Sequence, residues 1–553
     1  MSDHKLIAGY PAYMRESIEK VVASRPARLI NGPPKPMSPK ERQAILAEFH
    51  PDYKQEGKRK LQVGPSKGEL VPFEVADMLE ALPLVPPERI PLTQIDYDVD
   101  VLIIGGGGAG TVAAIFANDE GIPADQILIV TKLRHGDCNS IMAQGGIQAA
   151  DRPEDSPVHH YIDVMGGGHY ANKPDLVKAL VNDGPMIIQW HEEMGVIYDK
   201  KEDSYVEVHG GGTSRKRMHS AKDYTGKEIF TALRDEVRNR EIPVLEFYPA
   251  IELILDQHGN AAGAVLYNIE TCEYKIVRAK ATVLATGGFG RMHIQGFPTT
   301  NHYGATADGL VIAYRAGANI IDMDSVQYHP TGVAFPSAIL GQLATEKLRG
   351  MGAMPINKDG EAFVYHLEPR DVEASAIIRE CWGREMGIEA PSGIRGVWLD
   401  TPMIEEINGA GAIKENLAAM WTMWNRHGID ITKDPALVFP TLHYMNGGVE
   451  IDANGGTCIP GLYVGGEGDG GVHGKNRLMG NSLLDYNVFG RRAGISAVNW
   501  ASKVKLGKLT LEHAQAYQEA LCNVENALDR RSPMLLPDYR SEAFRERSLG
   551  VLF

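Results

Sequence analysis

The sequence predicts an α/β protein whose largest domain is built on a doubly wound parallel sheet. Residues 98–121 consist of a short apolar strand, a turn with four consecutive glycines and a helix, and "QILIVTK" at 126–132 supplies a second strand. A strand, a crossover helix and a parallel strand form the first unit of such a sheet. The 553 residues, 43% of them hydrophobic, can bury at least two cores, so two or three domains are expected.

The first 97 residues depart from this pattern. Thirteen of the 32 prolines fall within residues 1–91, and proline fixes φ and removes a backbone donor, which predicts an irregular N-terminal extension. Two short helices are expected inside it, at 13–23 and at 38–49, the second opening with a Ser-Pro start signal. The extension could wrap over its own chain or dock a partner protein, and the sequence leaves both possibilities open.

Charge and cysteine usage exclude several classes of function. The net charge of −15 argues against a nucleic-acid partner, because phosphate binding needs a basic face. The five cysteines include no C-x-x-C pair, so neither an iron–sulfur cluster nor another metal site is expected within this chain. The longest apolar stretch, 101–117, is broken by the four glycines, which predicts a cytoplasmic protein with no membrane span of its own.

The glycine turn fits a dinucleotide-binding motif. Gly105, Gly107 and Gly110 match G-x-G-x-x-G between a strand and a helix. The first glycine permits the tight turn, the second lets the backbone approach a pyrophosphate, and the third lets helix and strand pack closely. The second strand ends in Thr131 and Lys132 instead of the acidic residue that usually holds the ribose, which argues against a simple NAD site.

Several later stretches resemble one family. They are "SIMAQGGIQAA", "SAKDYTGKEI", "ATVLATGGFGR", "SVQYHPTG", "TEKLRGMGA", "PRDVEASAI", "HYMNGGVEID" and "GGEGDGGVHGKNRLMGNSLLDYNVFGRRAG". Their order resembles that in the flavoprotein subunits of fumarate reductases and succinate dehydrogenases, a family that includes L-aspartate oxidase. The resemblance covers roughly residues 98 to 495 and implies FAD as the cofactor. The family often ends its second strand in Ser-Lys, which accounts for Thr131 and Lys132.

The resemblance implies a particular domain arrangement. A split Rossmann-like FAD-binding domain is expected at 98–322 and 441–495, with an inserted α+β capping domain at 323–440. The proline-rich extension at 1–97 precedes them, and a shortened helical C-terminal segment at 496–553 follows. The capping domain is expected to move by a hinge and exclude water from the substrate.

Sixteen positions match residues that hold FAD in the family. They are Gly105, Gly107, Gly110, Thr131, Lys132, Asn139, Ser140, Gly145, Gly146, Thr286, Gly287, Asp308, Glu467, Asn481, Ser482 and Leu483. Two nearby positions depart from the family pattern: Met479 stands where a small residue is common, and Ala307 replaces a glycine.

Asn139 bears on the direction of electron flow. It stands where membrane-bound members of the family carry the histidine that bonds covalently to FAD. An amide is not a comparable nucleophile, and His135, four residues away, is not expected to substitute. The resemblance therefore implies non-covalent FAD. Because the covalent link raises the flavin potential in this family, its absence favours fumarate reduction over succinate oxidation.

The substrate site implied by the resemblance is suited to a four-carbon dianion. His329 and Thr345 match the pair that binds one carboxylate, and His443 and Arg477 match the pair that binds the other. A guanidinium can donate two parallel, charge-assisted hydrogen bonds to a carboxylate, and an imidazole N–H adds one further donor with a fixed direction. A single histidine is more often structural, but the four matches occur together and in order.

A proton relay is also implied. In the family, flavin gives a hydride to one alkene carbon of fumarate and an arginine protonates the other. Arg349 matches that donor, and Glu346 and Arg370 match the residues that link it to solvent. An arginine has a pKa above about 12, although neighbouring positive charge makes transient proton loss less costly. Spacing alone predicts only an i,i+3 surface ion pair between Glu346 and Arg349.

The expected activity is reversible reduction of fumarate to succinate by the catalytic subunit of a hetero-oligomer. The chain contains no second redox motif, so an external electron donor is required, and the family implies a separate iron–sulfur subunit. An L-aspartate oxidase and a dehydrogenase for substituted succinates are the alternatives. A catalytically silent flavin scaffold is a third hypothesis, and the complete set of matched residues argues against it.

Overall fold

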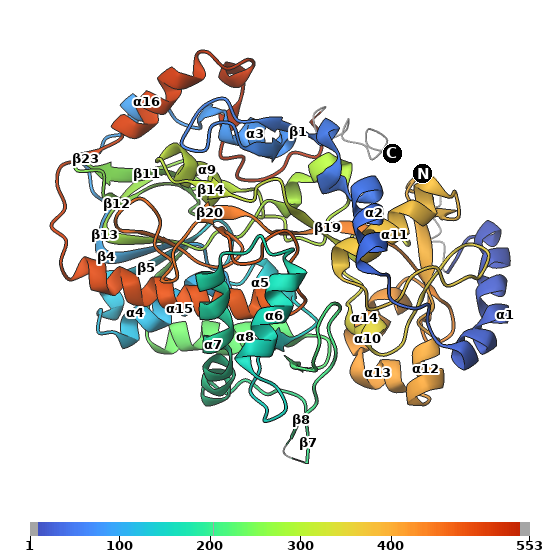
Figure 1. Ribbon diagram of the computed structural model, residues 1–553. Helices are drawn as coiled ribbons and strands as arrows, with labels where there is room; N and C mark the ends of the chain where they lie inside the picture. The colour runs from blue at the N-terminus through green and yellow to red at the C-terminus, as the bar shows by residue number, and fades with distance from the viewer. Residues whose placement is uncertain (1–8, 203, 542–553) are drawn as a thin grey trace, which may run out of the picture.

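A computed structural model describes residues 9–202 and 204–541, and its largest sheet has eight strands (Figure 1). In order these are β10 (Val244–Glu246), β5 (Ile127–Thr131), β4 (Tyr97–Ile104), β13 (Tyr274–Leu284), β12 (Ala261–Tyr267), β11 (Ala250–Asp256) and β23 (Leu509–Thr510), with β21 (Leu462–Val464) paired to the end of β13. The pairs among β10, β5, β4, β13 and β21 are parallel, and those among β13, β12, β11 and β23 are antiparallel. The predicted mixed α/β class and the first parallel unit are therefore confirmed.

Helices cover both faces of this sheet (Figure 1). The helices on one face are α4 (Gly108–Asp119), α7 (Pro174–Glu193), α8 (Thr225–Asn239) and α15 (Asn481–Ala501), and α3 (Phe73–Leu79), α9 (Asp308–Arg315) and α16 (Glu512–Leu521) lie on the other. Gly490 and Gly494 let α15 approach α4: a Cβ at these positions would lie 2.7 Å from the Ala109 carbonyl oxygen and 2.5 Å from that of Ala113. Small residues at this crossing thus fix how closely the two helices pack.

A second, antiparallel sheet lies beside the first. Its strands are β15 (Val326–Val333), β19 (Ala436–Met445), β18 (Arg395–Leu399) and β16 (Pro355–Ile356), with β17 (Ile388–Glu389) paired to β18. Helix α11 (Arg370–Ile378) packs on β15 and β19, and α12 (Met403–Asn408), α13 (Ala412–Asn416) and α14 (Ala418–Asn425) complete this unit (Figure 1). His329 on β15 and Arg370 on α11 line the same cavity as Ile104 at the end of β4.

The two helices predicted in the N-terminal extension are present. They are α1 (Arg15–Asn31) and α2 (Pro39–Phe49), and α2 begins with a capping box between Ser38 and Glu41. Arg25 and Arg28 both pair with the buried Asp400, the former at 2.7 Å, and α2 packs against α11. The extension therefore wraps over its own chain, which is one of the two possibilities that the sequence left open.

The C-terminal segment returns to the extension. After the ten-residue helix α16, β24 (Arg531–Ser532) pairs in parallel with β3 (Leu82–Pro83). Within the described part of the chain, every helix is too short or too polar to cross a bilayer.

Candidate active site

A cavity of about 500 Å³ extends from the glycine turn after β4 to the side chains of β15 and β19. Gly105 has φ +123°, and a Cβ there would lie 2.1 Å from the Ala285 carbonyl oxygen; a Cβ at Gly110 would lie 1.9 Å from the Gly105 carbonyl oxygen. Only glycine fits these two positions. At Gly107, which lines the cavity, the nearest atom to such a Cβ is 3.5 Å away, an ordinary contact, so packing within the protein does not require glycine there.

Most residues that the sequence nominated line this one cavity. The nominated residues in its wall are Gly105, Gly107, Thr131, Lys132, Asn139, Ser140, Gly145, Gly146, Thr286, Gly287, Asp308, His329, Thr345, Glu346, Arg370, His443, Glu467, Arg477, Ser482 and Leu483. Three nominated residues lie outside the wall. Gly110 is packed inside α4, Asn481 bonds to the buried His160 at 3.0 Å, and Arg349 lies behind Glu346.

Lys132 and Asp308 form a buried pair at the glycine-turn end. Lys132 Nζ lies 2.5 Å from Asp308 Oδ2 and donates to Thr306 Oγ1 at 2.7 Å. Burial lowers the pKa of Lys132, and the neighbouring Asp308 carboxylate opposes that shift. Ala307, which precedes α9, has φ +66°, a conformation that favours glycine. This strain explains physically why the family usually has glycine there.

Asn139 is held at both ends of its amide. Its Nδ2 donates to Asn301 Oδ1 at 2.7 Å and to Glu467 Oε2 at 3.4 Å, and its Oδ1 accepts the His302 backbone N–H at 2.6 Å. Burial raises the pKa of Glu467 to about 7. The side chain at position 139 is thus an ordered hydrogen-bonding group in the cavity wall.

His135 is a structural residue. Its Nε2 lies 3.0 Å from Thr111 Oγ1, its ring packs edge-on against Phe230, and it does not line the cavity. Met479 does line the cavity, and a Cβ at Gly145 would lie 2.3 Å from its Cε. The long side chain at 479 therefore shapes this wall, and its terminal methyl would have to shift if residue 145 carried a Cβ.

Two histidines face each other at the far end of the cavity. The ring centroids of His329 and His443 are 5.0 Å apart. Burial, together with nearby arginines, holds the pKa of both imidazoles well below the usual value, so both rings are neutral. His329 Nδ1 accepts the Thr331 N–H at 3.2 Å, which places the ring proton on Nε2. In the described part of the chain Nε2 has no partner, so it presents a buried donor.

Gln327, which the sequence analysis did not single out, lies outside the cavity wall but contacts two arginines that line it. Its Oε1 accepts from Arg370 Nη1 and from Arg477 Nη2, each at 2.9 Å. The Arg477 guanidinium also lies 4.5 Å from the centre of the Tyr444 ring. A signal was available, because Gln327 and His329 are two residues apart on β15 and therefore point to the same side of the strand. Burial, followed by the charge of Arg370, lowers the pKa of Arg477 to about 9.

Glu346 joins the two arginines of the expected relay. Its Oε2 lies 2.8 Å from Arg370 Nε and 3.2 Å from Arg349 Nη2, and its Oε1 accepts the Gly211 N–H at 2.6 Å. Burial alone would raise the pKa of Glu346, but Arg370, Arg349 and the Gly211 N–H lower it to about 2. The i,i+3 pair with Arg349 forms as spacing predicted, but it is completely buried, not at the surface.

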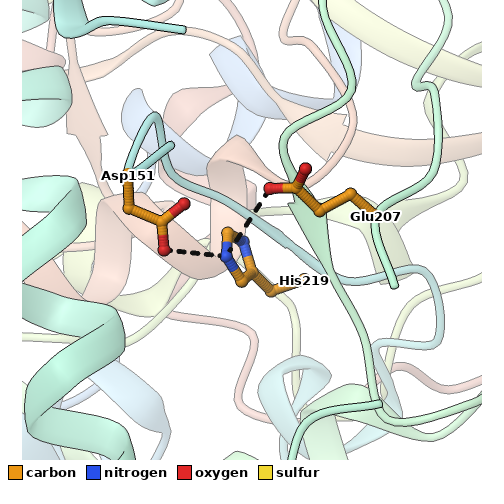
Figure 2. Close-up of side chains that lie close together, drawn as sticks. All are labelled: Asp151, Glu207 and His219. Carbon is orange, nitrogen blue, oxygen red and sulfur yellow. Dashed lines mark hydrogen bonds and ion pairs between the residues drawn. The ribbon is translucent and has the colours of Figure 1, made fainter. Parts of the chain in front are cut away.

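The segment that supplies Gly211 is anchored by a second ion-pair cluster, outside the cavity (Figure 2). His219 Nε2 lies 3.0 Å from Asp151 Oδ2 and 3.7 Å from Glu207 Oε1, while Arg152 Nε lies 2.8 Å from Glu207 Oε2. The Arg152 guanidinium offsets the charge of Glu207. The cluster ties the segment between Glu207 and His219 to Asp151 and Arg152, which follow β6 (Ile147–Gln148); β6 pairs with β9 (Met218–His219) and begins one residue after Gly146.

Comparison with known proteins identifies the family. The "FAD binding domain" family model matches residues 100–483. The fumarate reductase (CoM/CoB) of Methanothermobacter marburgensis contains a subunit that is 39% identical, over 72% of each chain. The L-aspartate oxidase of Streptomyces coelicolor is 34% identical, over 80% of this chain and 74% of its own. A mutant E. coli quinol fumarate reductase has a TM-score of 0.69 and 30% identity, covering 77% of this chain and 74% of its own.

The cavity fits FAD. A glycine turn and the start of α4 lie at one end, where backbone N–H groups and the helix dipole favour a diphosphate. The unpartnered His329 donor and Arg477 lie at the other. FAD is therefore the cofactor, and the chain belongs to the family of FAD-dependent oxidoreductases that comprises the flavoprotein subunits of fumarate reductases and succinate dehydrogenases and includes L-aspartate oxidase.

Proposed function

We propose that this chain is the catalytic subunit of a fumarate reductase, which reduces fumarate to succinate reversibly. The observation that carries the proposal is the convergence, at one end of the FAD cavity, of two neutral imidazoles and two guanidinium groups. Positive charge with directed N–H donors suits a small dicarboxylate, because charge-assisted hydrogen bonds give both affinity and orientation. His329 and Thr345 would hold one carboxylate, and His443 and Arg477 the other.

The domain boundaries belong to this proposal. A split FAD-binding domain at 98–322 and 441–495 is supported by β21, which joins the first sheet from a distant part of the chain. A capping domain at 323–440 is supported by the separate antiparallel sheet that begins with β15. The extension at 1–97 and the helical segment at 496–553 flank the two domains.

Bound FAD would supply the hydride, and this chain's residues would bind the dianion and deliver the proton. Arg349 is the proposed donor, with Glu346 and Arg370 beside it. Arg349 lies behind Glu346 and outside the cavity wall, whereas Arg370 lines it, so a proton from Arg349 would have to pass through Glu346 and Arg370 or be brought forward by closure of the capping domain. Such closure would also exclude water from the substrate.

FAD is proposed to be non-covalent, since position 139 carries an amide already engaged in three hydrogen bonds. Electrons would come from a separate iron–sulfur protein. The M. marburgensis relative is named as one subunit of its enzyme, which supports a hetero-oligomer. We still predict that the extension docks that partner. Because the extension also packs on its own chain, docking would use the outward-facing surface of the extension.

An L-aspartate oxidase is the second candidate. It is favoured by the S. coelicolor relative, which covers as much of this chain as the fumarate reductases do. A substituted succinate is a third possibility, because Met479 alters the wall of the cavity.

The test is anaerobic fumarate reduction by the FAD-loaded chain with reduced viologen dye, beside aerobic oxygen consumption with L-aspartate. Activity with fumarate that Arg349→Ala removes, without loss of FAD, would support the proposal. Oxygen consumption with aspartate and inactivity toward fumarate would replace it with the second candidate. Succinate derivatives, assayed in the oxidative direction with a dye acceptor, test the third possibility.

A further inference from the structure

Residues of the N-terminal extension bind the segment that leads into α11. Glu368 lies two residues before Arg370, the first residue of α11, and its side chain is completely buried. Its Oε1 accepts the Met37 N–H at 2.5 Å, and its Oε2 lies 2.8 Å from Arg42 Nη2. Met37 directly precedes the Ser38 cap of α2, and Arg42 lies on that helix. The start of α2 therefore holds the segment from which α11 begins.

Apolar side chains also join these two helices. Ile45 and Leu46 on α2 lie in one buried cluster with Val372 and Ala376 on α11. The apolar contacts hold the helices together, and the polar contacts of Glu368 restrain the point at which α11 begins.

Two further contacts restrain the same turn from other parts of the chain. Asp371, directly after Arg370, pairs through Oδ2 with His169 Nε2 at 2.6 Å. A Cβ at Gly211 would lie 3.0 Å from the Glu368 carbonyl oxygen, so the backbone is closely packed there. The loss of one restraint should therefore shift this turn without unfolding the helix.

The charge on Glu368 is favoured by the extension. Burial raises the pKa of Glu368, the Met37 N–H and Arg42 oppose that rise, and the charge of Asp371 adds to it. The Arg42 side chain is 36% exposed, so it can be shortened without leaving a cavity in the core. Arg42 is thus the member of this contact that is suited to substitution.

We propose that the extension positions Arg370 in the wall of the active-site cavity, with Arg42 and Glu368 as positioning residues. Arg370 is the arginine of the expected relay that lines the cavity, and it donates to Glu346 at 2.8 Å and to Gln327 at 2.9 Å. Because Arg370 is the first residue of α11, a shift of that turn moves its guanidinium relative to both acceptors. The expected effect on catalysis rests on the proposed fumarate reduction.

The test compares Arg42→Gln with Arg42→Lys and Arg25→Gln in the FAD-loaded full chain. Arg25 also joins the extension to a buried carboxylate, but that of Asp400, which follows β18. We expect Arg42→Gln to lower kcat for fumarate reduction roughly fivefold to tenfold, because small misplacements of a reacting group slow the chemistry. KM should change less than about twofold, since the proposed carboxylate ligands are other side chains. Lysine keeps a cation for Glu368 and should restore most of kcat, and Arg25→Gln should retain it.

A second measurement needs no turnover. Amide hydrogen exchange of residues 368–373 in the FAD-loaded protein should be faster in Arg42→Gln than in the wild type, and unchanged in Arg25→Gln. Faster exchange in a protein whose wild type does not reduce fumarate would support the positioning contact and refute the proposed function alone.

Three outcomes would overturn the inference. The first is unchanged exchange at the start of α11 in Arg42→Gln, whether or not fumarate is reduced. The second is an active wild type whose kcat Arg42→Gln leaves unaltered. The third is an equal loss of kcat in Arg42→Gln and Arg25→Gln, which would show that the extension acts only through general stability.

Discussion

Arg370 and Arg477 donate to the same atom, Gln327 Oε1, each at 2.9 Å. Two guanidinium groups repel one another. A neutral acceptor that both share fixes their separation and orientation without adding another charged group to the site. Gln327 is therefore a positioning residue for the end of the cavity that would receive a carboxylate.

Replacing Gln327 by alanine should loosen both guanidinium groups. We expect KM for fumarate to rise roughly tenfold, since a lost hydrogen bond to a charged group corresponds to about 1.5–3 kcal/mol, with a smaller change in kcat. Steady-state kinetics would show this, with the exposed Gln189→Ala as control. Equal KM values in the two variants would contradict the positioning role.

The flavin should be released when the protein is denatured by acid, because Asn139 offers no nucleophile and its amide is fully engaged. The measurement is the flavin absorbance of the supernatant after acid precipitation. Flavin that stays in the pellet would show a covalent bond to some other residue.

Asn139→Ala should in addition weaken FAD retention during gel filtration, because Glu467 and Asn301 then lose the hydrogen-bond donor at position 139.

Asp469, which lies beside Asp485, should hold a proton in the folded state. Asp485 Oδ2 lies 3.0 Å from the Tyr444 hydroxyl and 3.2 Å from His473 Nε2, whereas no such donor reaches Asp469 in the described part of the chain. Burial, then the charge of Asp485, holds the pKa of Asp469 well above its usual value. Above the unfolded pKa of about 3.9, the folded state then binds more protons, so the free energy of unfolding falls as pH rises toward the folded pKa.

Asparagine replacements distinguish the two members of this pair. Asp469→Asn mimics a protonated acid, so it should fold as the wild type does and flatten the fall in stability with pH. Asp485→Asn should destabilise the fold, because Tyr444 and His473 lose an anionic acceptor. Urea denaturation at several pH values checks both. Identical behaviour of the two variants would refute the assignment of the proton to Asp469.

The pairing of the extension with Asp400 should contribute strongly to stability. Arg25 and Arg28 are largely buried and both contact this carboxylate, whose side chain is fully buried. Asp400→Asn should destabilise the protein by about 3–5 kcal/mol, because it leaves buried guanidinium groups without an anion. Thermal unfolding and limited proteolysis of residues 9–31 would measure this, with the exposed Asp359→Asn, which affects only Lys20, as control. Unchanged melting would contradict a strong contribution of the Asp400 pairing to stability.

Local features were predicted well from the sequence. The glycine turn, the first parallel unit and the starts of α1 and α2 depend on residues close together in the chain, where steric limits on φ and capping geometry decide the structure. Most of the residues that the resemblance nominated also lie together in one cavity wall, from Gly105 to Leu483, and their roles there stay predictions.

Other features depended on contacts between distant segments. No local pattern places Gln327 between two arginines, Glu373 against Arg349, or Asp469 beside Asp485, and helical spacing predicted a surface position for a pair that is buried.

The sequence by itself thus determined the chemical inventory of this protein: a nucleotide-binding turn, imidazole and guanidinium side chains of the kind that suit a dicarboxylate, and an amide at position 139. Tertiary structure alone decided which of those groups carry protons and which carry charge. The physical reason is that protonation depends on desolvation and on neighbouring charges, and both are set by how β15, α11 and the extension pack together, not by the order of residues along any one of them.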